Sequence, residues 1–442
     1  MSKQPTEVEL LVTELGEDGL GHSELNERPV WVRNALPGET VKARILKRRR
    51  GIRFADGEWL ADAHPDRQPS ACEYFPRCGG CSLHHLSYAA QLRHKEAGLH
   101  KQLARVGIEP DSLPWRKPVG EVRLGYRRKA RLGVRALGDR VLVGFRESFS
   151  SRVAQISHCQ TLTPELSRLL VPLQQLLPQL SIADAVPQIE FAQGDLDICV
   201  MLRHLKPLSD ADLGLLQDFA RQQRVELLLQ SKGYDSLANV FNQAPPQHLT
   251  YQLQDYGLTL GFFPDQFIQV NTRMNRELVS TVMGYLHPLP GLKLLDLFCG
   301  VGNFSLPAAR LGAQVYGLEF SDAAVAMAEV NAARNRLGGK ARFGVADLYS
   351  TESLPNVSSQ SEASSAYDAL LLDPPRSGAG PHLANWLAQT KLSRIVYVSC
   401  NPATFADDAK IILDAGFSFQ EVGVYDLFPQ TAHVETIGVF QR

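Results

Sequence analysis

The stretch at residues 293–306, KLLDLFCGVGNFSL, constrains the fold of this chain more than any other part of the sequence. Its apolar start predicts a short strand ending at Asp296, and Gly300 and Gly302 predict a tight turn into a helix. Glycine lets the backbone approach a ligand where a Cβ atom would clash, and the N–H groups of a helix start suit a polar or anionic ligand. The next apolar run ends near Glu319, whose carboxylate is placed to accept hydrogen bonds from ribose hydroxyls. The stretch therefore predicts a nucleoside-cofactor site, with an ordinary strand-to-helix turn as the alternative.

Strands alternate with helical segments from about residue 263 to the C-terminus. This alternation predicts an α/β, Rossmann-like domain over residues 263–442, with a doubly wound sheet that binds ligands at the carboxyl ends of its strands. The Ser- and Glu-rich segment at 351–366 predicts a surface loop.

The length of 442 residues exceeds what one hydrophobic core accommodates, so we expect a multidomain α+β protein divided into residues 1–65, 66–262 and 263–442. Residues 1–160 carry 27 Lys and Arg against 19 Asp and Glu, whereas the remainder carries 19 against 28. A basic N-terminal part suggests a nucleic-acid-binding region that is attached to a domain with a different function. No apolar run approaches the roughly 20 residues of a membrane span, and the N-terminus lacks a signal-peptide layout, so we expect a cytoplasmic protein.

Residues 8–62 alternate between apolar and polar positions, with turn signals between short runs. Five or so short strands predict a small OB-like β-barrel, and the pattern resembles a TRAM domain, an RNA-binding barrel. Five basic residues fall on one predicted hairpin: Lys47, Arg48, Arg49, Arg50 and Arg53. We interpret them as phosphate contacts, with a solvated face as the alternative.

Three cysteines, Cys72, Cys78 and Cys81, lie in a loop with the spacing C-x5-C-x2-C, and Cys159 follows further along the chain. Four thiolates can hold zinc or an iron–sulfur cluster, and the spacing does not decide between them. Unrelated buried thiols are the alternative. We expect solvated or structural roles for His84 and His85.

The region from residue 115 to 260 predicts an antiparallel β domain, and a basic run lies at its start. Its cationic side chains are Arg123, Arg127, Arg128, Lys129, Arg131 and Arg135. Arginine on a strand beside Tyr126 suits phosphate binding and base stacking, and a polar sheet face is the alternative.

Three polar residues in the C-terminal region suggest catalysis. Asp373 and Cys400 each end an apolar run, where a doubly wound sheet places its ligands, and Glu435 lies near the C-terminus. A cysteine there is a candidate nucleophile, although alone it is as well explained as a core thiol. The pattern D-x-F-x-G-x-G at residues 296–302 resembles the first motif of S-adenosylmethionine methyltransferases. A thiolate and a carboxylate beside such a methyl-sulfonium cofactor suit methylation of pyrimidine carbon 5. Cys400 would add to carbon 6, and Glu435 would remove the carbon-5 proton.

Several motifs together resemble the RNA uracil-C5 methyltransferases: C-x5-C-G-G-C, F-x-Q-V-N, LDLFCGVGNFSL, DPPR, SCNP and HVET. The resemblance covers essentially the whole chain. Within the family, the N-terminal barrel and the cysteine box look most like the bacterial enzymes that act on 23S ribosomal RNA.

The resemblance implies S-adenosyl-L-methionine as cofactor and methylation of one uridine of 23S ribosomal RNA, at the uracil-1939 site. It implies a [4Fe–4S] cluster on Cys72, Cys78, Cys81 and Cys159, with Cys400 as nucleophile and Glu435 as base. It implies cofactor contacts from Gln269, Phe298, Asn303, Glu319, Asp347 and Asp373. We expect a monomer with no obligate protein partner and no membrane contact. The alternatives are the same chemistry on another ribosomal or transfer RNA uridine, and a non-catalytic RNA-binding iron–sulfur protein.

Overall fold

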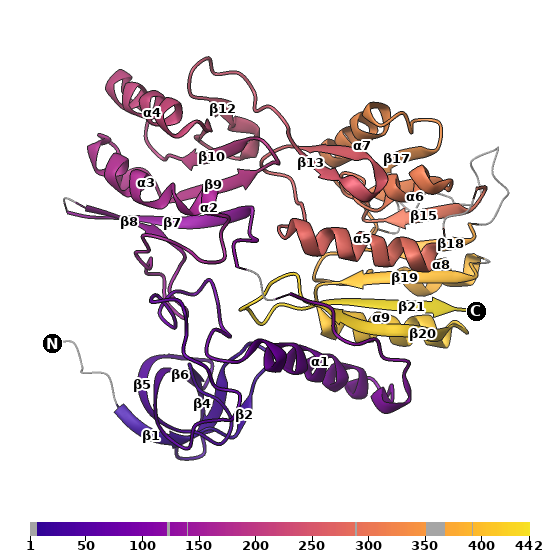
Figure 1. Cartoon of the computed structure of the whole chain (residues 1–442), viewed down its shortest axis with the longest axis horizontal. Coiled ribbons are helices and arrows are strands. Elements are labelled where there is room, and N and C mark those ends of the chain that lie inside the picture. The colour runs from indigo at the N-terminus through magenta and orange to yellow at the C-terminus, as the bar shows by residue number, and fades with distance from the viewer. Residues whose placement is uncertain (1–6, 122–123, 139, 288–289, 351–366, 391) are drawn as a thin grey trace.

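Three main β-sheets and the helices around them make up the chain (Figure 1). The computed structural model describes residues 7–121, 124–138, 140–287, 290–350, 367–390 and 392–442. The predicted loop at 351–366 and Arg123 of the basic run lie outside the described residues. Among the described helices, none is long and apolar enough to cross a membrane.

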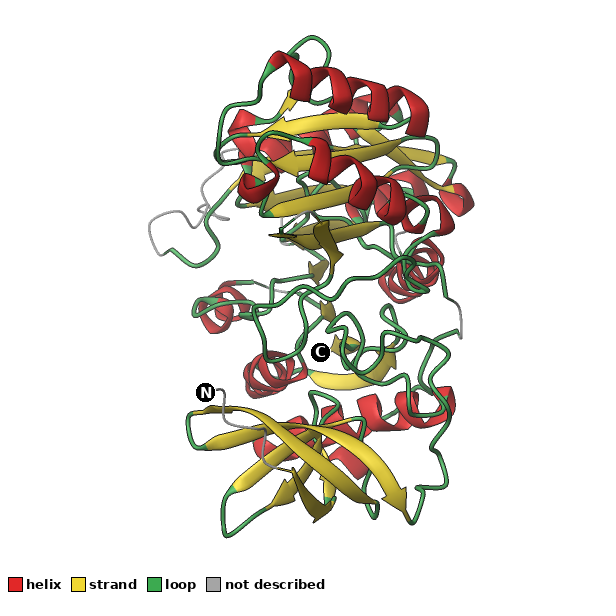
Figure 2. Cartoon of the chain, turned by 90° about the vertical axis from the view of Figure 1, so that its left-hand side faces the viewer, coloured by secondary structure: helices red, strands yellow, loops and turns green. Residues whose placement is uncertain are grey.

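The N-terminal part is a curled six-stranded sheet, seen at the bottom of Figure 2. Its strands are β1 (Glu7–Leu11), β2 (Glu14–Leu15), β3 (Gly21–Glu24), β4 (Pro29–Arg33), β5 (Thr40–Arg49) and β6 (Ile52–Ala61). They pair in the order β1-β5-β6-β4-β3-β2, and only β4 and β6 are parallel. Alternate residues such as Val30, Val32, Val41 and Ala43 are fully buried inside the curl, because successive side chains of a strand point to opposite faces.

The predicted basic hairpin is formed by β5 and β6, and four of its five basic side chains are exposed. Residues 47–50 are exposed at its tip. Arg53 is buried and donates a hydrogen bond from Nη1 to the Leu25 carbonyl at 2.9 Å. The expectation of a phosphate contact at Arg53 is therefore wrong, since its guanidinium joins two parts of the barrel.

The central sheet has six strands in the order β12-β11-β10-β9-β7-β8. They are β7 (Lys129–Leu137), β8 (Arg140–Gly144), β9 (Gln188–Gln193), β10 (Ile198–Arg203), β11 (Glu226–Gln230) and β12 (Ala238–Asn239). Its helices are α2 (Pro164–Ser167), α3 (Leu170–Leu176) and α4 (Asp210–Gln223), with 3-10 turns at Leu177–Gln179, Ala183–Ala185 and Tyr234–Ser236. All neighbours are antiparallel except β10 and β11, so the predicted antiparallel pattern is confirmed with one exception.

Two cations of the basic run at the start of this sheet, Arg128 and Arg131, form ion pairs within the protein. Arg128 is buried and donates to Asp195 at 2.8 Å, and Arg131 forms an ion pair with Glu190. Tyr126 is buried too, and its hydroxyl donates to the Pro429 carbonyl at 3.0 Å. The interpretation of the run as phosphate-binding and base-stacking arginines is therefore wrong for the buried Arg128 and stays a prediction for Arg131 and Arg135, which are exposed.

The C-terminal sheet has seven strands in the order β17-β16-β15-β18-β19-β21-β20. Its strands are β15 (Lys293–Leu297), β16 (Gln314–Glu319), β17 (Ala341–Val345), β18 (Ala369–Leu372), β19 (Arg394–Ser399), β20 (Ser418–Tyr425) and β21 (Glu435–Gln441). Its helices are α5 (Thr272–Leu286), α6 (Ser305–Leu311), α7 (Asp322–Arg334), α8 (Leu383–Gln389) and α9 (Pro402–Asp414). The hairpin of β13 (Leu249–Leu253) and β14 (Leu258–Phe262), with a 3-10 turn at Gln254–Tyr256, precedes α5.

Two apolar layers cover this sheet, one on each face. Residues of α5, α6 and α7 share a core with Leu294, Val315 and Leu371, whereas residues of α8 and α9 share a core with Leu295 and Leu370. Neighbouring residues of one strand point to opposite faces, so helices lie on both sides. The five strands β15 to β19 are parallel, and β21 runs antiparallel to both β19 and β20. The predicted doubly wound sheet is confirmed.

Helix α1 (Tyr88–Arg105) packs on the C-terminal sheet although it follows the cysteine loop in sequence (Figure 1). It contacts α9 and β20, and Leu99 and Leu103 are fully buried in the same core as Phe405. A short 3-10 turn (Pro110–Ser112) follows. The chain then pairs with β20, because Arg116 N–H donates to Val422 and Val119 N–H donates to Val424. Residues 88–119 thus belong spatially to the C-terminal sheet.

Candidate active site

The glycine turn follows β15 and has the backbone conformation that glycine favours. Gly300 and Gly302 have φ angles of 53° and 92°, and Phe298 also has a positive φ, of 65°. A Cβ atom on Gly302 would lie 3.1 Å from the Leu306 side chain. The N–H groups of Phe298 and Cys299 both donate to the Leu318 carbonyl, which ties the turn to the end of β16. The predicted turn from strand to helix is confirmed.

Three carboxylates surround this turn at the carboxyl ends of neighbouring parallel strands. Asp296 is fully buried and accepts a hydrogen bond from Ser305, and burial raises its pKa to about 7. Burial and then the charges of Asp296 and Glu319 raise the pKa of Asp373 to about 8. Glu319 accepts hydrogen bonds from Gly300 N–H at 3.2 Å and from Ser321 N–H at 3.0 Å. Such a site disfavours a phosphate and suits a ligand with hydroxyl and cationic groups.

Asn303 begins the segment that leads into α6, and its carboxamide is held by two other elements. It exchanges hydrogen bonds with the Asn275 amide of α5 at 3.0 and 2.9 Å, and Tyr251 of β13 donates to its oxygen at 3.0 Å. No local motif indicates Asn275 or Tyr251, because these residues lie 28 and 52 positions from Asn303 in the chain.

The other predicted cofactor residues lie around the same edge of the sheet. Phe298 is half-buried in the turn, with its ring centroid 6.1 Å from that of Tyr349. Asp347 follows β17 and accepts a hydrogen bond from Tyr349 N–H at 3.0 Å. The preceding Ala346 N–H donates to the Glu319 carbonyl at 2.9 Å. Gln269 is half-buried in the loop between β14 and α5.

Cys400 and Glu435 lie side by side at this edge, one just after β19 and the other at the start of β21. Burial, followed by the charges of Glu435 and Asp373, raises the pKa of the half-buried Cys400 thiol to about 11. Glu435 is 2% exposed, and burial followed by the charge of Asp373 raises its pKa well above the usual value. The structure therefore brings these three predicted residues into one electrostatic group.

Arg376 supplies a positive charge beside this group. It lowers the pKa of both Cys400 and Glu435, against the effect of burial. Its Nη2 lies 2.7 Å from His433 Nδ1, and its carbonyl accepts a hydrogen bond from Asn401 Nδ2 at 2.8 Å. Arg376 belongs to the DPPR motif, but the motif alone does not indicate this role.

All four predicted metal-binding cysteines line a single small cavity. They are Cys72, Cys78, Cys81 and Cys159, and Phe75, Phe145 and Ile156 complete the walls. Burial raises the pKa of the Cys78 thiol to about 11 and also raises that of Cys72 and Cys81, and the Cys159 thiol adds to all three shifts. Hydrogen bonds from the backbone N–H groups of Tyr74 and Phe75 lower the pKa of the Cys72 thiol, against the effect of burial.

The cavity also has polar support. The Cys159 sulfur lies 3.3 Å from Thr161 Oγ1, and the Cys159 N–H donates to Ser167. Within the described part of the chain, no three His, Cys, Asp or Glu side chains form a group that could hold one metal ion. His84 and His85 are buried, so of the two roles expected for them the solvated one is wrong.

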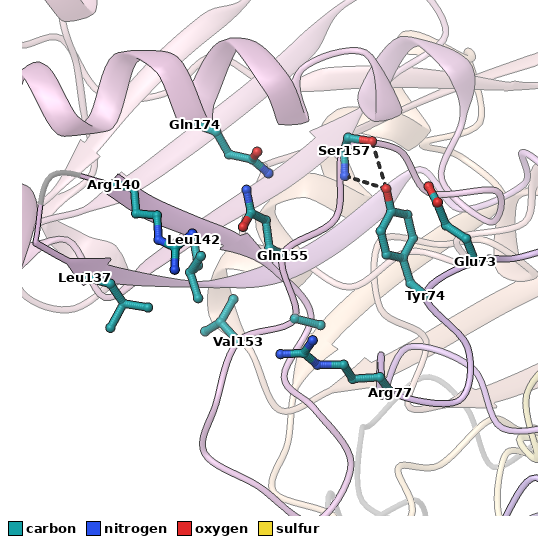
Figure 3. A pocket seen from close by; sticks show the side chains of 11 residues that line it. Glu73, Tyr74, Arg77, Leu137, Arg140, Leu142, Val153, Gln155, Ser157 and Gln174 are labelled. Carbon is teal, nitrogen blue, oxygen red and sulfur yellow. Dashed lines mark hydrogen bonds between the residues drawn. The ribbon is translucent and has the colours of Figure 1, made fainter. Parts of the chain in front are cut away.

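Tyr74, which lines the cysteine cavity, also lines an open cavity of about 590 Å³ (Figure 3). Arg77 and Arg140 line it together with Gln155 and Gln174, and the Tyr74 hydroxyl lies 2.8 Å from Ser157 Oγ. None of the candidate catalytic residues lines this cavity.

Comparisons with known proteins agree with this architecture. Residues 87–442 match the model of the tRNA (uracil-5-)-methyltransferase family, and residues 2–60 match the TRAM domain. A protein of Hahella chejuensis named 23S rRNA (uracil(1939)-C(5))-methyltransferase RlmD is 40% identical over 439 residues, 98% of this chain and 96% of that protein. A protein of the same name from Acidithiobacillus ferrooxidans is 40% identical over 443 residues, 99% of this chain and 98% of that protein.

A solved structure shows the same fold. The Pyrococcus abyssi tRNA (uracil-54, C5)-methyltransferase, solved with S-adenosyl-L-homocysteine, superposes with a TM-score of 0.73 at 24% identity. The match covers 98% of this chain and 100% of that one. The predicted TRAM domain and methyltransferase fold are therefore confirmed, and the chain belongs to the RNA uracil-C5 methyltransferase family.

Proposed function

We propose that this protein transfers a methyl group from S-adenosyl-L-methionine to carbon 5 of uracil 1939 in 23S ribosomal RNA. The observation that carries the proposal is the register of β19 and β21, which brings Cys400 next to Glu435 at the edge of the sheet where the charge of Asp373 acts on both. The named activity of the relatives, which match nearly the whole chain, supports the RNA and the position.

Cys400 acts first in the proposed reaction. Carbon 5 of uracil is a weak nucleophile, and addition of the Cys400 thiolate to carbon 6 turns the ring into an enolate with electron density at carbon 5. Arg376 favours this thiolate, because its positive charge lowers the thiol pKa. The bound cofactor supplies an electrophilic methyl group to carbon 5.

Glu435 acts last. Its carboxylate removes the carbon-5 proton, the electron pair forms the 5,6 double bond, and the Cys400 sulfur leaves carbon 6 as thiolate. Because burial raises the pKa of Glu435, its carboxylate is a stronger base than an exposed one. The target base has to leave its stack to reach these two residues.

The cofactor site that we propose comprises Gln269, Phe298, Asn303, Glu319, Asp347 and Asp373. Three observations support it. The backbone of the glycine turn leaves room for close approach at Gly300, Glu319 retains lone pairs for ribose hydroxyls, and the local excess of carboxylates favours a sulfonium cation.

We also propose that Cys72, Cys78, Cys81 and Cys159 hold a [4Fe–4S] cluster. The common cavity, the apolar walls and the polar contacts to Cys72 and Cys159 support this donor set. The proposed methylation needs no electron transfer, so the cluster would brace the fold. Exposed cations at residues 47–50 would contact RNA phosphates. The monomeric state without an obligate protein partner and the cytoplasmic location remain proposals. The division into residues 1–65, 66–262 and 263–442 also remains a proposal, with residues 88–119 of the middle part packed on the C-terminal sheet.

A covalent trap tests the proposed function. The protein is mixed with S-adenosyl-L-methionine and a 23S fragment that carries 5-fluorouridine at position 1939, and the products are separated on a denaturing gel. Because fluorine cannot leave as a proton does, we expect a methylated adduct that is absent in Cys400→Ala. Cys199→Ala, which alters a buried thiol of β10, is the matched control and should keep the band. A band with a transfer RNA fragment and none with the 23S fragment would indicate transfer RNA as the substrate. If the protein binds RNA but gives no band with any of them, the result would support a non-catalytic RNA-binding protein.

A further inference from the structure

We propose that the segment after Cys81, together with helix α1, holds the loop that leads into Glu435 and so sets the position of this base for the elimination step. This inference rests on the proposed function. The loop at residues 426–434 joins β20 to β21, and Glu435 is the first residue of β21.

Gln430 is the central residue of this loop. Its φ angle is 70°, which L side chains rarely adopt, and it is 6% exposed. Its carbonyl accepts hydrogen bonds from the N–H groups of both Ser82 and Leu83, each at 3.0 Å. These residues directly follow Cys81, so the backbone of the cysteine loop and the backbone of the Glu435 loop are bonded to each other.

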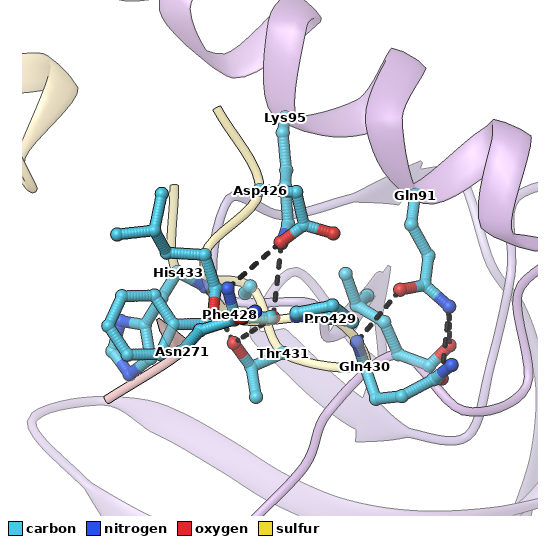
Figure 4. A network of polar contacts seen from close by, with 12 residues as sticks. Gln91, Lys95, Asn271, Asp426, Phe428, Pro429, Gln430, Thr431 and His433 are labelled. Atoms are coloured by element: carbon cyan, nitrogen blue, oxygen red, sulfur yellow. Dashed lines mark hydrogen bonds and ion pairs between the residues drawn. The ribbon is translucent and has the colours of Figure 1, made fainter. Parts of the chain in front are cut away.

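Helix α1 holds the same residue through its side chain (Figure 4). Gln91, which is fully buried, accepts a hydrogen bond from Gln430 N–H at 3.0 Å and donates to Gln430 Oε1 at 3.1 Å. The Gln91 amide also donates to the Leu83 and Leu86 carbonyls at 3.1 and 2.9 Å. One glutamine of α1 therefore joins the cysteine loop to the loop at residues 426–434.

An ion pair fixes the start of the loop. Lys95 Nζ lies 2.6 Å from Asp426 Oδ1, both side chains are fully buried, and Lys95 also donates to the Phe428 carbonyl at 3.3 Å. Figure 4 shows this pair one helical turn from Gln91. At the other end, Ala432 N–H donates to Ser82 Oγ at 3.0 Å. Residues 82–95 thus hold the loop at its start, middle and end, and His433, two residues before Glu435, also contacts Arg376.

A displaced loop should affect one step of the reaction. Cys400 lies between β19 and α9, and the hydrogen bonds of Gln91 and Ser82 described above do not involve it. Addition and methyl transfer should therefore be less affected than proton removal by Glu435. Since general-base catalysis is worth about 10²- to 10⁴-fold, partial displacement should slow elimination by roughly tenfold or more.

The variant Gln91→Ala tests this, with ordinary uridine RNA as substrate. We expect the covalent RNA adduct, which wild type resolves, to accumulate on a denaturing gel with S-adenosyl-L-methionine, while the rate of adduct formation and the KM for the cofactor stay near wild type. Gln102→Ala on the same helix is the matched control, because Gln102 contacts Glu17 of the barrel instead of this loop, and it should show no adduct. Ser82→Ala removes only one acceptor and serves as a milder second variant.

The outcomes separate this inference from the proposed function. If Gln91→Ala and Ser82→Ala lose addition and turnover in equal proportion, with no adduct, the residues stabilise the fold without positioning the base, and the inference is overturned. If both turn over like wild type, it is overturned as well. If wild type itself neither methylates RNA nor forms the 5-fluorouridine adduct, the proposed function fails.

Discussion

Cys400 and Glu435 occupy facing positions just beyond the last paired residues of β19 and β21. Ser399 pairs with Thr436 in the antiparallel register of these strands, so the next residue of one strand and the preceding residue of the other meet at the sheet edge. The register therefore places the nucleophile and the base next to each other at one edge of the sheet.

Replacing Glu435 with glutamine should stop the reaction after methyl transfer. Glutamine keeps the shape but cannot accept the carbon-5 proton, so Glu435→Gln should accumulate a covalent RNA adduct with ordinary uridine and lose about 10²-fold or more in turnover. Addition should not suffer, because loss of the carboxylate removes a charge that raises the Cys400 pKa. Denaturing gels and single-turnover kinetics measure this. Glu58→Gln, an exposed position of β6, is the control, and absence of any adduct would remove Glu435 from the base role.

Arg376 should control how the reactivity of Cys400 depends on pH. The thiolate is the reactive form, and its fraction rises with pH toward the thiol pKa of about 11. Arg376→Ala removes the charge that lowers this pKa, so the pKa should rise and the pH profile of alkylation should move to higher pH. Iodoacetamide labelling of the Cys400 peptide without RNA, followed by mass spectrometry, measures the shift. Arg221→Ala on α4 should leave the profile unchanged, and an unchanged profile in Arg376→Ala would contradict the prediction.

The sheet and its polar edge could be predicted from the sequence, because the patterns that indicate them span only a few neighbouring residues. Asp373 and Cys400 each follow an apolar run, and parallel strands place such residues at one edge of a sheet. Gly300 and Gly302 reveal their turn through their need for positive φ. These features need no knowledge of distant contacts.

Long-range pairing explains what the sequence did not reveal. The bond between Gln91 and Gln430 joins residues 339 positions apart, and neither lies in a motif. The basic run was misread at Arg128 because its partner, Asp195, lies on a different segment 67 residues away. The sequence does not distinguish an exposed arginine from one that forms an ion pair, because the fold decides which carboxylate lies next to it.

Cys81→Ser should remove the metal group. The wild-type protein, purified without oxygen, should contain iron and acid-labile sulfide in equal amounts, with visible absorption that a strong chelator and oxidant abolish. Cys81→Ser should lose both and fold poorly, because Ser82 and Leu83 hold the neighbouring loop. Elemental analysis measures this, and Cys199→Ala should retain iron. Zinc without iron or sulfide in wild type would overturn the cluster assignment.

Replacing only one partner of the Lys95–Asp426 ion pair should lower the free energy of unfolding strongly. Lys95→Met fills similar volume but leaves a carboxylate buried without its cation, so we expect destabilisation of about 3–5 kcal/mol. Adding Asp426→Asn should recover much of this loss, because the neutral amide keeps an acceptor for Phe428 N–H. Urea unfolding followed by tryptophan fluorescence measures both variants. Equal stability of Lys95→Met and wild type would contradict the prediction.

The strand-like segment around Trp115 and Val119 has a consequence for dissecting this protein. It covers β20, the outermost strand of the C-terminal sheet, with backbone hydrogen bonds. An uncovered outer strand offers free N–H and C=O groups to other chains. A fragment cut at residue 263 would therefore self-associate through β20, whereas a fragment that begins before α1 would keep its edge capped and stay dispersed.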